Sequence, residues 1–255
     1  MSEHLKTEQF GPIAVITVDR PPVNAYNREI RDGIAAAVSR FELDPEVRAI
    51  VLTATGSVFS GGQDMEEPEV RAAGGIPYSV LRSFDRLCDA LTHSPKPTIA
   101  AINGSAIGGG LEVVLSCDLR IAAASAKFGA VGARMGLIAS TQRLVRVVGE
   151  PQAKLMAFTA RRLDATAAAA VGLVHEVVPD ADLLAAALAL GSEIAQTAPL
   201  SIARAKQAIN RASDVPLADG LRMQREFFLE LSQTEDHREA VRAFREKRAP
   251  DFHSR

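Results

Sequence analysis

Short apolar segments alternate with stretches of helical periodicity along the first two thirds of the chain. Ile13–Val18 and Ala49–Ala54 are rich in β-branched residues, and residues 27–43 between them place apolar side chains near a helical period. Further strands are expected at Thr98–Ile102, 119–122 and Glu176–Val178, and Val80, Phe84, Leu87 and Leu91 mark another amphipathic helix. Strands that alternate with helices predict an α/β fold built on a parallel sheet.

After Val178 the pattern becomes helical throughout. Helices are expected at 183–197, 199–212, Leu217–Leu231 and 234–248, and the Ala-rich segment Ala165–Ala170 is also expected to be helical. The last helix has acidic residues at its start and basic residues at its end, the order that the helix dipole favours. An α/β unit of ~200–250 residues can form one domain, so we expect one main domain with a helical C-terminal region.

Composition narrows the possible partners. With 47% hydrophobic residues the chain can form a core, and a formal net charge of −2 argues against nucleic-acid binding. Cys88 and Cys117 are too few for a disulfide framework and too far apart in sequence for a metal motif. The first residues lack an apolar signal region, and no apolar run reaches the ~18 residues of a membrane span. These features predict a cytoplasmic protein that binds neither membranes nor metals.

Two glycine-rich segments each follow an expected strand, at residues 59–64 and 103–112. Glycines let backbone N–H groups approach a ligand closely, and two such loops at one end of a sheet could direct their N–H groups at one oxygen. Each donor of such an oxyanion hole contributes ~3 kcal/mol to lowering the barrier. Considered alone, the glycines are also explained as turn or packing residues. The second segment lacks the ending of a phosphate loop and the spacing of a dinucleotide fingerprint.

An ordered series of motifs over residues 10–250 resembles the crotonase superfamily, the enoyl-CoA hydratase/isomerase family in particular. The series comprises Asp19-Arg20-Pro21 with Asn24-Ala25, Phe59 to Asp64, Lys96-Pro97, Ala101 to Glu112 with Cys117-Asp118, Phe128-Gly129, Gly136-Leu137-Ile138, Thr141-Gln142-Arg143-Leu144, Gly172-Leu173-Val174, Ala198-Pro199 and Phe244 to Arg248. The resemblance implies a crotonase-like (ClpP/crotonase) spiral of ββα and βαβ turns over residues 1–195 and a helical oligomerisation region over 196–255, forming homotrimers or hexamers.

The same resemblance implies roles for individual residues. The N–H groups of Gln63 and Gly109 correspond to the oxyanion-hole donors, and Glu112 corresponds to one of the two acid/base glutamates of hydratases. The residues expected to bind CoA are Asn24, Ala25, Gly61, Gly62, Gln63, Asp64, Gly109, Phe244 and Lys247, the last two with CoA of the same or a neighbouring subunit. Coenzyme A enters as part of the acyl-CoA substrate, and no separate cofactor or metal is expected.

The chain departs from the family pattern at three places. Gly132 stands where the family has its second glutamate, the loop before Thr141 is about three residues shorter than usual, and Gln63 replaces a small residue. We expect an enoyl-CoA hydratase-type lyase acting on fatty or related acyl-CoA. Two alternatives stay open: an acyl-CoA-binding homologue with weak or no hydratase activity, or another enolate reaction such as isomerisation, decarboxylation or C–C cleavage.

Several other charged residues lie near the expected site in the sequence. Glu66, Glu67 and Glu69 could supply a missing acid, but a solvated charged face is the simpler interpretation. Arg134 is expected to be a surface cation and His93 a helix-end residue.

Overall fold

The computed structural model describes residues 3–254 and contains a six-stranded sheet in the order β1-β2-β3-β5-β7-β10. Its strands are β1 (Leu5–Phe10), β2 (Ile13–Val18), β3 (Ala49–Ala54), β5 (Thr98–Ile102), β7 (Leu119–Ala123) and β10 (Glu176–Val178). All five predicted strands are present, β7 with one more residue at its end. Neighbouring strands pair in parallel except β1 with β2, which form an antiparallel hairpin that the sequence patterns did not indicate.

Both faces of this sheet are buried. On one face Ile16 and Leu52 pack with residues of the helices α1 (Arg28–Leu43) and α3 (Tyr78–His93). On the other face the cluster that contains Val15 and Val51 packs against α7 (Leu183–Ala195). Burial on both sides explains why β2, β3 and β5 are continuous apolar runs.

A second, four-stranded sheet has the order β4-β6-β8-β9. Its strands are short: β4 (Val58–Ser60), β6 (Ser105–Ile107), β8 (Lys127–Gly129) and β9 (Arg162–Asp164). β4 follows β3 and β6 follows β5, so each turn of chain leaves the large sheet and enters the small one before it reaches a helix. This arrangement puts the two glycine-rich segments beside each other, because β4 and β6 are paired neighbours.

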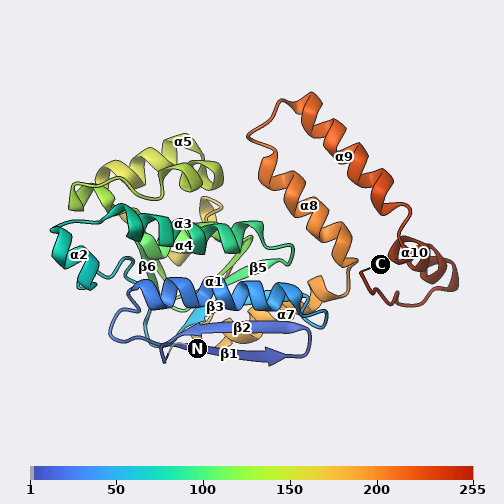
Figure 1. Cartoon of the computed structure of the whole chain (residues 1–255), viewed down its shortest axis with the longest axis horizontal. Helices are drawn as coiled ribbons and strands as arrows, with labels where there is room; N and C mark the ends of the chain where they lie inside the picture. Colours follow the sequence, from blue (N-terminus) through green and yellow to red (C-terminus); the bar gives the residue numbers. More distant parts are fainter. Residues whose placement is uncertain (1–2, 255) are drawn as a thin grey trace.

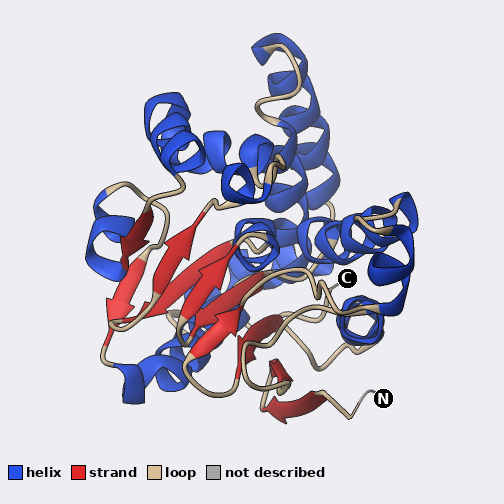
Figure 2. Cartoon of the chain, turned by 90° about the vertical axis from the view of Figure 1, so that its left-hand side faces the viewer, coloured by secondary structure: helices blue, strands red, loops and turns tan. Residues whose placement is uncertain are grey.

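The remaining helical elements cover the two sheets (Figures 1 and 2). They are α2 (Pro68–Ala73), α4 (Gly109–Ser116), the 3₁₀ helix η1 (Gly132–Met135), α5 (Thr141–Thr159), α6 (Ala165–Ala170) and the 3₁₀ helix η2 (Asp180–Asp182). The predicted helix at 27–43 begins one residue later, since Asn27 is its N-cap and accepts a 3.0 Å hydrogen bond from the Ile30 N–H. α3 ends at His93, as expected.

The four predicted C-terminal helices are present. They are α7, α8 (Pro199–Arg211), α9 (Leu217–Leu231) and α10 (Glu235–Glu246), with ends that differ from the prediction by two residues at most. α7 lies against the large sheet, whereas α8, α9 and α10 extend away from it (Figure 1). The predicted boundary between residues 195 and 196 coincides with the end of α7, and the division into two domains stays a prediction.

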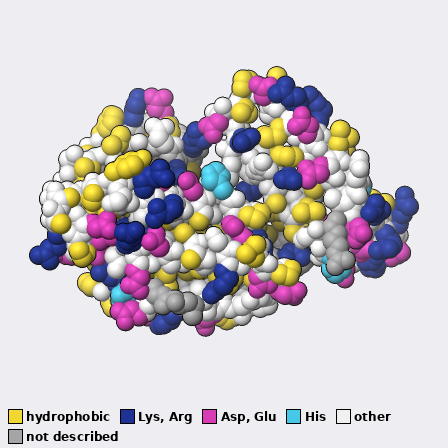
Figure 3. Space-filling view, viewed as in Figure 1, with side chains coloured by type: hydrophobic (Ala, Val, Ile, Leu, Met, Phe, Trp, Pro, Cys, Tyr) yellow, Lys and Arg dark blue, Asp and Glu magenta, His cyan; other side chains and the backbone are white. Residues whose placement is uncertain are grey.

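One buried lysine ties the extended helices to the core. Lys206 of α8 lies 2.7 Å from the Asp118 carboxylate and donates 3.0 Å to the Leu91 carbonyl at the end of α3. In the space-filling view a notch separates the α5 side of the molecule from the α8–α9 side, and acidic and basic side chains are mixed over this face (Figure 3). Across residues 3–254, no single helix is long and apolar enough to cross a membrane; α7 and α8 together pass that test only as a pair bent by 107°.

Candidate active site

The two glycine-rich segments meet backbone to backbone. A Cβ placed on Gly62 would lie 2.8 Å from the Gly109 nitrogen, and a Cβ on Gly109 would lie 3.2 Å from the Gln63 nitrogen. Gly62 also has a φ of +99°, which L side chains rarely adopt. Glycines are therefore required at this contact, and the expectation that the two segments come together is confirmed.

Both proposed donor N–H groups are free of regular backbone partners. Gly109 is the first residue of α4, where N–H groups have no intrahelical acceptor. Gln63 forms a parallel bridge with Tyr26 in which Gly62 O and Asp64 N make the hydrogen bonds. The N–H of Gln63 itself therefore faces away from Tyr26, on the side where Gly109 lies.

Asn24 shapes the first loop from inside. Its side-chain Nδ2 donates to the backbone carbonyls of Thr55 (2.9 Å) and Val58 (2.6 Å). Its backbone carbonyl accepts a 2.8 Å hydrogen bond from Ser60 Oγ. The side chain is 2% exposed, and φ is +49°. Asn24 thus links the end of β3 to β4 and holds Ala25 beside Gly61 and Gly62.

Asp64 is also engaged within the protein. Its carboxylate lies 2.7 Å from the Arg20 guanidinium and accepts 2.9 Å from the Glu66 N–H. The residues predicted for the CoA site between 24 and 64 are therefore gathered in one place, although the side chains of Asn24 and Asp64 serve the loop itself.

The side chain of Gln63 enters a buried polar network that the sequence reasoning missed. Arg31 donates to both carboxylate oxygens of Glu67 (3.0 Å each) and to Gln63 Oε1 (2.8 Å). Arg31 is 1% exposed and Glu67 is 5% exposed. The expectation that Glu67 belongs to a solvated charged face is wrong, because its charge is neutralised inside the fold. The only sequence signal for this network was the polar residue Gln63 four positions before Glu67. It did not identify Arg31, which comes from α1.

Glu112 stands in the first turn of α4 and is paired with a cation from α5. Arg143 Nη1 donates to Glu112 Oε1 at 2.6 Å, while its Nη2 lies 3.8 Å from Asp89. The Glu112 side chain is 19% exposed, so it retains access to solvent. Arg143 therefore fixes one oxygen of the carboxylate and leaves the other available for proton transfer.

Gly132 has no room for a side chain. A Cβ there would lie 2.8 Å from the Leu137 carbonyl oxygen and 3.1 Å from the Ala139 nitrogen. The shortened loop folds back over η1 at this point and continues to Ser140, whose hydroxyl donates 3.3 Å to the Gly108 carbonyl beside the second glycine segment. Arg134 in η1 is exposed, as expected.

Neither cysteine offers a reactive thiolate, and His175 is engaged within the protein. Burial raises the pKa of both Cys88 and Cys117 to about 12, so both thiols are neutral. Burial also lowers the pKa of His175, whose Nδ1 accepts the Arg120 N–H. Among residues 3–254, no three His, Cys, Asp or Glu side chains form a group suited to a metal ion.

Phe244 and Lys247 lie far from the glycine segments of their own chain. Arg48 precedes β3 and donates to the carbonyls of Phe252 (3.3 Å) and Thr197 (2.8 Å). The C-terminal tail is thus bound at the start of β3, whereas the glycine segment 61–63 lies beyond the end of β3. Figure 1 shows α10 at the opposite end of the molecule from α2. One chain therefore does not bring these two residues to Gln63 and Gly109.

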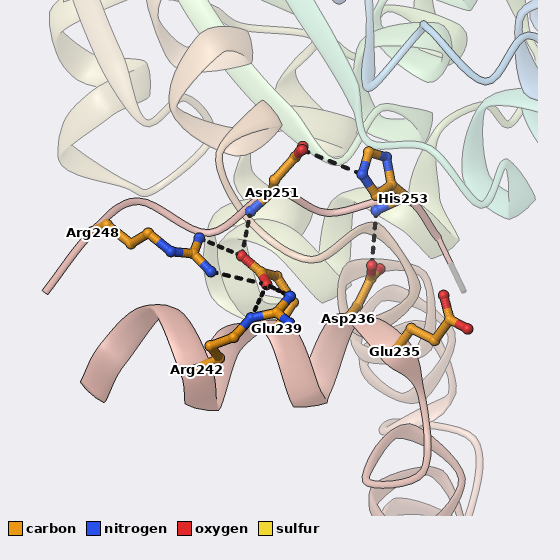
Figure 4. Close-up of a pocket in the computed structure, with 7 residues that line it drawn as sticks. All are labelled: Glu235, Asp236, Glu239, Arg242, Arg248, Asp251 and His253. Carbon is orange, nitrogen blue, oxygen red and sulfur yellow. Dashed lines mark hydrogen bonds and ion pairs between the residues drawn. The ribbon is translucent and has the colours of Figure 1, made fainter. Parts of the chain in front are cut away.

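Residues around a cavity at α10 anchor the C-terminal tail. The cavity has a volume of about 310 Å³ and is lined by Glu235, Asp236, Glu239, Arg242, Arg248, Asp251 and His253 (Figure 4). Glu239 pairs with both arginines and accepts the Asp251 N–H, while Asp236 accepts the His253 N–H. Apart from Glu235, these residues are held by hydrogen bonds and ion pairs with one another, and none belongs to the glycine-loop site.

Solved structures share this fold over nearly the full chain. A crystal structure of an enoyl-CoA hydratase from Bacillus anthracis has a TM-score of 0.92 at 30% identity and covers 99% of this chain and 100% of that chain. Pseudomonas aeruginosa DspI has a TM-score of 0.91 at 35% identity, covering 98% and 97% respectively. The protein has the crotonase fold, with a helical C-terminal region.

Sequence comparison agrees with the fold. A family model described as enoyl-CoA hydratase/isomerase matches residues 8–255. The short-chain-enoyl-CoA hydratase of Clostridium acetobutylicum is 37% identical over 247 residues, covering 94% of each chain. The probable enoyl-CoA hydratase echA8 of Mycobacterium tuberculosis is 35% identical over 255 residues, covering 98% of each. The chain belongs to the enoyl-CoA hydratase/isomerase family.

Proposed function

We propose that the protein is an acyl-CoA enzyme of the enoyl-CoA hydratase type, in which Gln63 and Gly109 bind the thioester oxygen and Glu112 transfers protons. Membership of the family and relatives named enoyl-CoA hydratase over nearly their full length support the activity. The observation that carries the site is the contact between the Gly62–Gln63 and Gly109 backbones, which places two N–H groups without regular partners side by side.

Hydration of a 2-enoyl thioester creates negative charge on the thioester oxygen when water attacks Cβ. Two backbone donors aimed at that oxygen stabilise the enolate, and each contributes ~10²–10³-fold to the rate. They need no side chain of their own, so replacement of a small residue by Gln63 is compatible with the role.

One carboxylate can complete the proton transfers. Glu112 takes a proton from the attacking water as the C–O bond forms, and then returns a proton to Cα as the enolate collapses. The net result is addition of H and OH across the double bond with Glu112 regenerated. Arg143 orients the carboxylate for this cycle, because its hydrogen bond holds one of the two Glu112 oxygens in place.

The lack of a carboxylate at position 132 supports one other candidate reaction within the same site. Gly132 offers no proton-transfer group and no space for one, and this favours reactions that need fewer such groups. Decarboxylation of a malonyl-type CoA ester, or C–C cleavage, forms the same thioester enolate by loss of a carbon group and then requires only protonation at Cα.

We also propose that the active unit is a homotrimer, alone or stacked as a hexamer. Large apolar side chains remain exposed on the outer helices: Ile209, Leu217, Leu221, Phe228, Leu229 and Phe244. Contact with a second copy would bury them, and would let Phe244 and Lys247 reach the CoA of a neighbouring subunit although they lie far from the site of their own chain.

A cytoplasmic location is supported by the two buried free thiols.

Incubation of the purified protein with enoyl-, 3-hydroxyacyl- and malonyl-type CoA esters, followed by mass spectrometry, tests this proposal. We expect interconversion of crotonyl-CoA and 3-hydroxybutyryl-CoA, and loss of that activity in Glu112→Gln. Release of CO₂ from a malonyl-type ester without hydration would favour the second candidate. Tight binding with no turnover of any ester would contradict both.

A further inference from the structure

The carboxamide of Gln63 uses both of its polar ends inside the protein. Its Oε1 accepts from Arg31 Nη1 at 2.8 Å, and its Nε2 donates to Glu67 Oε2 at 2.8 Å and to the Asp64 carbonyl at 2.9 Å. The same residue, Gln63, carries the backbone N–H that is the proposed oxyanion donor. The orientation of that peptide is therefore linked directly to the buried Arg31–Glu67 pair.

Arg31 connects several segments around this loop. Besides Glu67 and Gln63, it donates to Ser83 Oγ of α3 at 2.5 Å and to the Tyr26 carbonyl at 2.8 Å. Its guanidinium also lies 5.7 Å from the centre of the Phe84 ring. The Phe84 ring in turn abuts the second loop, since its Cζ lies 2.7 Å from where a Cβ on Gly109 would stand. Arg31 therefore reaches both proposed donors, Gln63 by a hydrogen bond and Gly109 through Phe84.

The first loop needs such a restraint. Gly61 and Gly62 precede Gln63, and glycine backbones have the widest conformational freedom of any residue. An N–H that acts as an oxyanion donor must be held in place before the reaction, because a displacement of ~1 Å can cost ~10²-fold in rate. A half-buried side chain on the donor residue, with both ends of its carboxamide hydrogen-bonded, supplies that restraint where a small residue could not.

We propose that Arg31 and Glu67 are positioning residues of the oxyanion hole, which act through the Gln63 carboxamide to fix the Gln63 N–H beside Gly109. The proposal deepens the proposed function and rests on it for the identity of the donors. The positioning role explains why Gln63 replaces a small residue and why Glu67 is buried. Hydration chemistry itself requires neither feature.

The variant Gln63→Met tests the proposal with the least disturbance. It keeps the backbone N–H, the side-chain length and the Arg31–Glu67 ion pair, and removes only the carboxamide hydrogen bonds. Removing Arg31 alone would leave the Glu67 charge buried without a partner and could prevent folding. The matched control is Arg28→Met, which breaks an exposed ion pair of 2.7 Å between Arg28 and Glu69 that joins the same helices, α1 and α2.

Two measurements are made on each folded variant. The first is the kcat and KM of crotonyl-CoA hydration. The second is the ultraviolet band of the enolate of bound acetoacetyl-CoA, whose negative charge is shared between the ketone and thioester oxygens. A donor pair that binds the thioester oxygen favours this enolate, so the band reports the oxyanion hole without turnover. We expect Gln63→Met to lower kcat by about 10–100-fold with less than about a threefold change in KM, and to weaken the enolate band. Arg28→Met should leave all of these values unchanged.

Equal kcat and enolate band in Gln63→Met and the wild type would overturn the positioning role while leaving the proposed function intact. If the wild type forms the bound enolate but hydrates nothing, the proposed hydration fails, and the enolate band alone decides the positioning role. If the wild type neither hydrates crotonyl-CoA nor forms the enolate, both proposals are overturned.

Discussion

The Leu137 N–H donates a 2.9 Å hydrogen bond to the Gly132 carbonyl, and the Leu137 carbonyl oxygen occupies the space that a Cβ at Gly132 would need. Two departures from the family pattern, the missing glutamate and the shortened loop, are therefore one structural change. The short loop can close over η1 only because residue 132 has no side chain. A carboxylate at this position and the present loop exclude each other.

Gly132→Glu alone should consequently destabilise the protein without creating a hydratase site. We expect the free energy of unfolding to fall by ~1–3 kcal/mol, the range for inserting atoms into a space that is already filled. Urea unfolding measures this change, and crotonyl-CoA hydration should not increase. Gly132→Glu combined with insertion of Pro-Gly-Gly between Ile138 and Ala139 should raise hydration by ~10²-fold, and the insertion alone serves as the control. An increase in hydration from Gly132→Glu by itself would show that the loop does not exclude a side chain.

Comparison of Gln63→Pro with Gln63→Ala isolates the backbone donor. Both variants lose the carboxamide network, but only proline lacks the N–H. We therefore expect kcat in Gln63→Pro to be ~10²–10³-fold below that of Gln63→Ala, with similar affinity for acyl-CoA. Equal kcat values in two folded variants would remove the Gln63 N–H from the oxyanion hole.

Arg143→Ala should lower kcat at least ~10-fold, because the Glu112 carboxylate loses the cation that fixes one of its oxygens. Guanidinium ion added to the assay should restore part of this activity, which a purely structural defect would not allow. Arg146→Ala is the control, since Arg146 lies in the same helix and forms an exposed ion pair with Asp214. A rise in kcat on removal of Arg143 would mean that the ion pair inhibits Glu112.

Acidification should release the C-terminal tail from α10. Hydrogen bonds from Arg248 and Arg242 lower the pKa of Glu239 from its ordinary value of 4.5 to about 2. Because the folded-state pKa is the lower one, these contacts stabilise the tail fully above pH 4.5 and are lost as the pH falls from 4.5 towards 2. Hydrogen–deuterium exchange of the C-terminal peptide, corrected for intrinsic rates, should show lost protection over this interval. Glu239→Gln should show the same loss at pH 7, and protection unchanged in that variant would refute the anchoring role.

Light scattering at micromolar concentration should give the mass of a trimer or hexamer. Phe228→Glu should shift the protein towards monomer, because it places a charge on a face where Phe228 is 71% exposed in the single chain. Leu43→Glu is a suitable control, since Leu43 is equally apolar and 86% exposed but lies at the end of α1. A monomeric wild type would contradict the proposed assembly, and with it any CoA contact from a neighbouring Phe244.

The sequence by itself determined five of the six strands of the large sheet, the C-terminal helices and the location of the glycine segments. Ile13–Val18, Ala49–Ala54 and Thr98–Ile102 were predicted with their true ends because strands buried on both faces are continuous apolar runs. The strands of the second sheet were missed, since β4, β6, β8 and β9 span three residues each and are too short for any periodicity. The hairpin strand β1 was missed because its residues are mostly exposed and polar.

Only the tertiary structure decided which side chains surround the glycine segments. Periodicity gave no reason to pair Arg31 with Glu67, because Arg31 lies in α1 and Glu67 is the N-cap of α2. Their charges are tolerated inside only through that pairing. In the same way, the sequence showed that Gly132 carries no carboxylate, but the approach of Leu137 showed that none can fit. Contacts between segments distant along the chain depend on how the layers pack, and local propensity does not encode that packing.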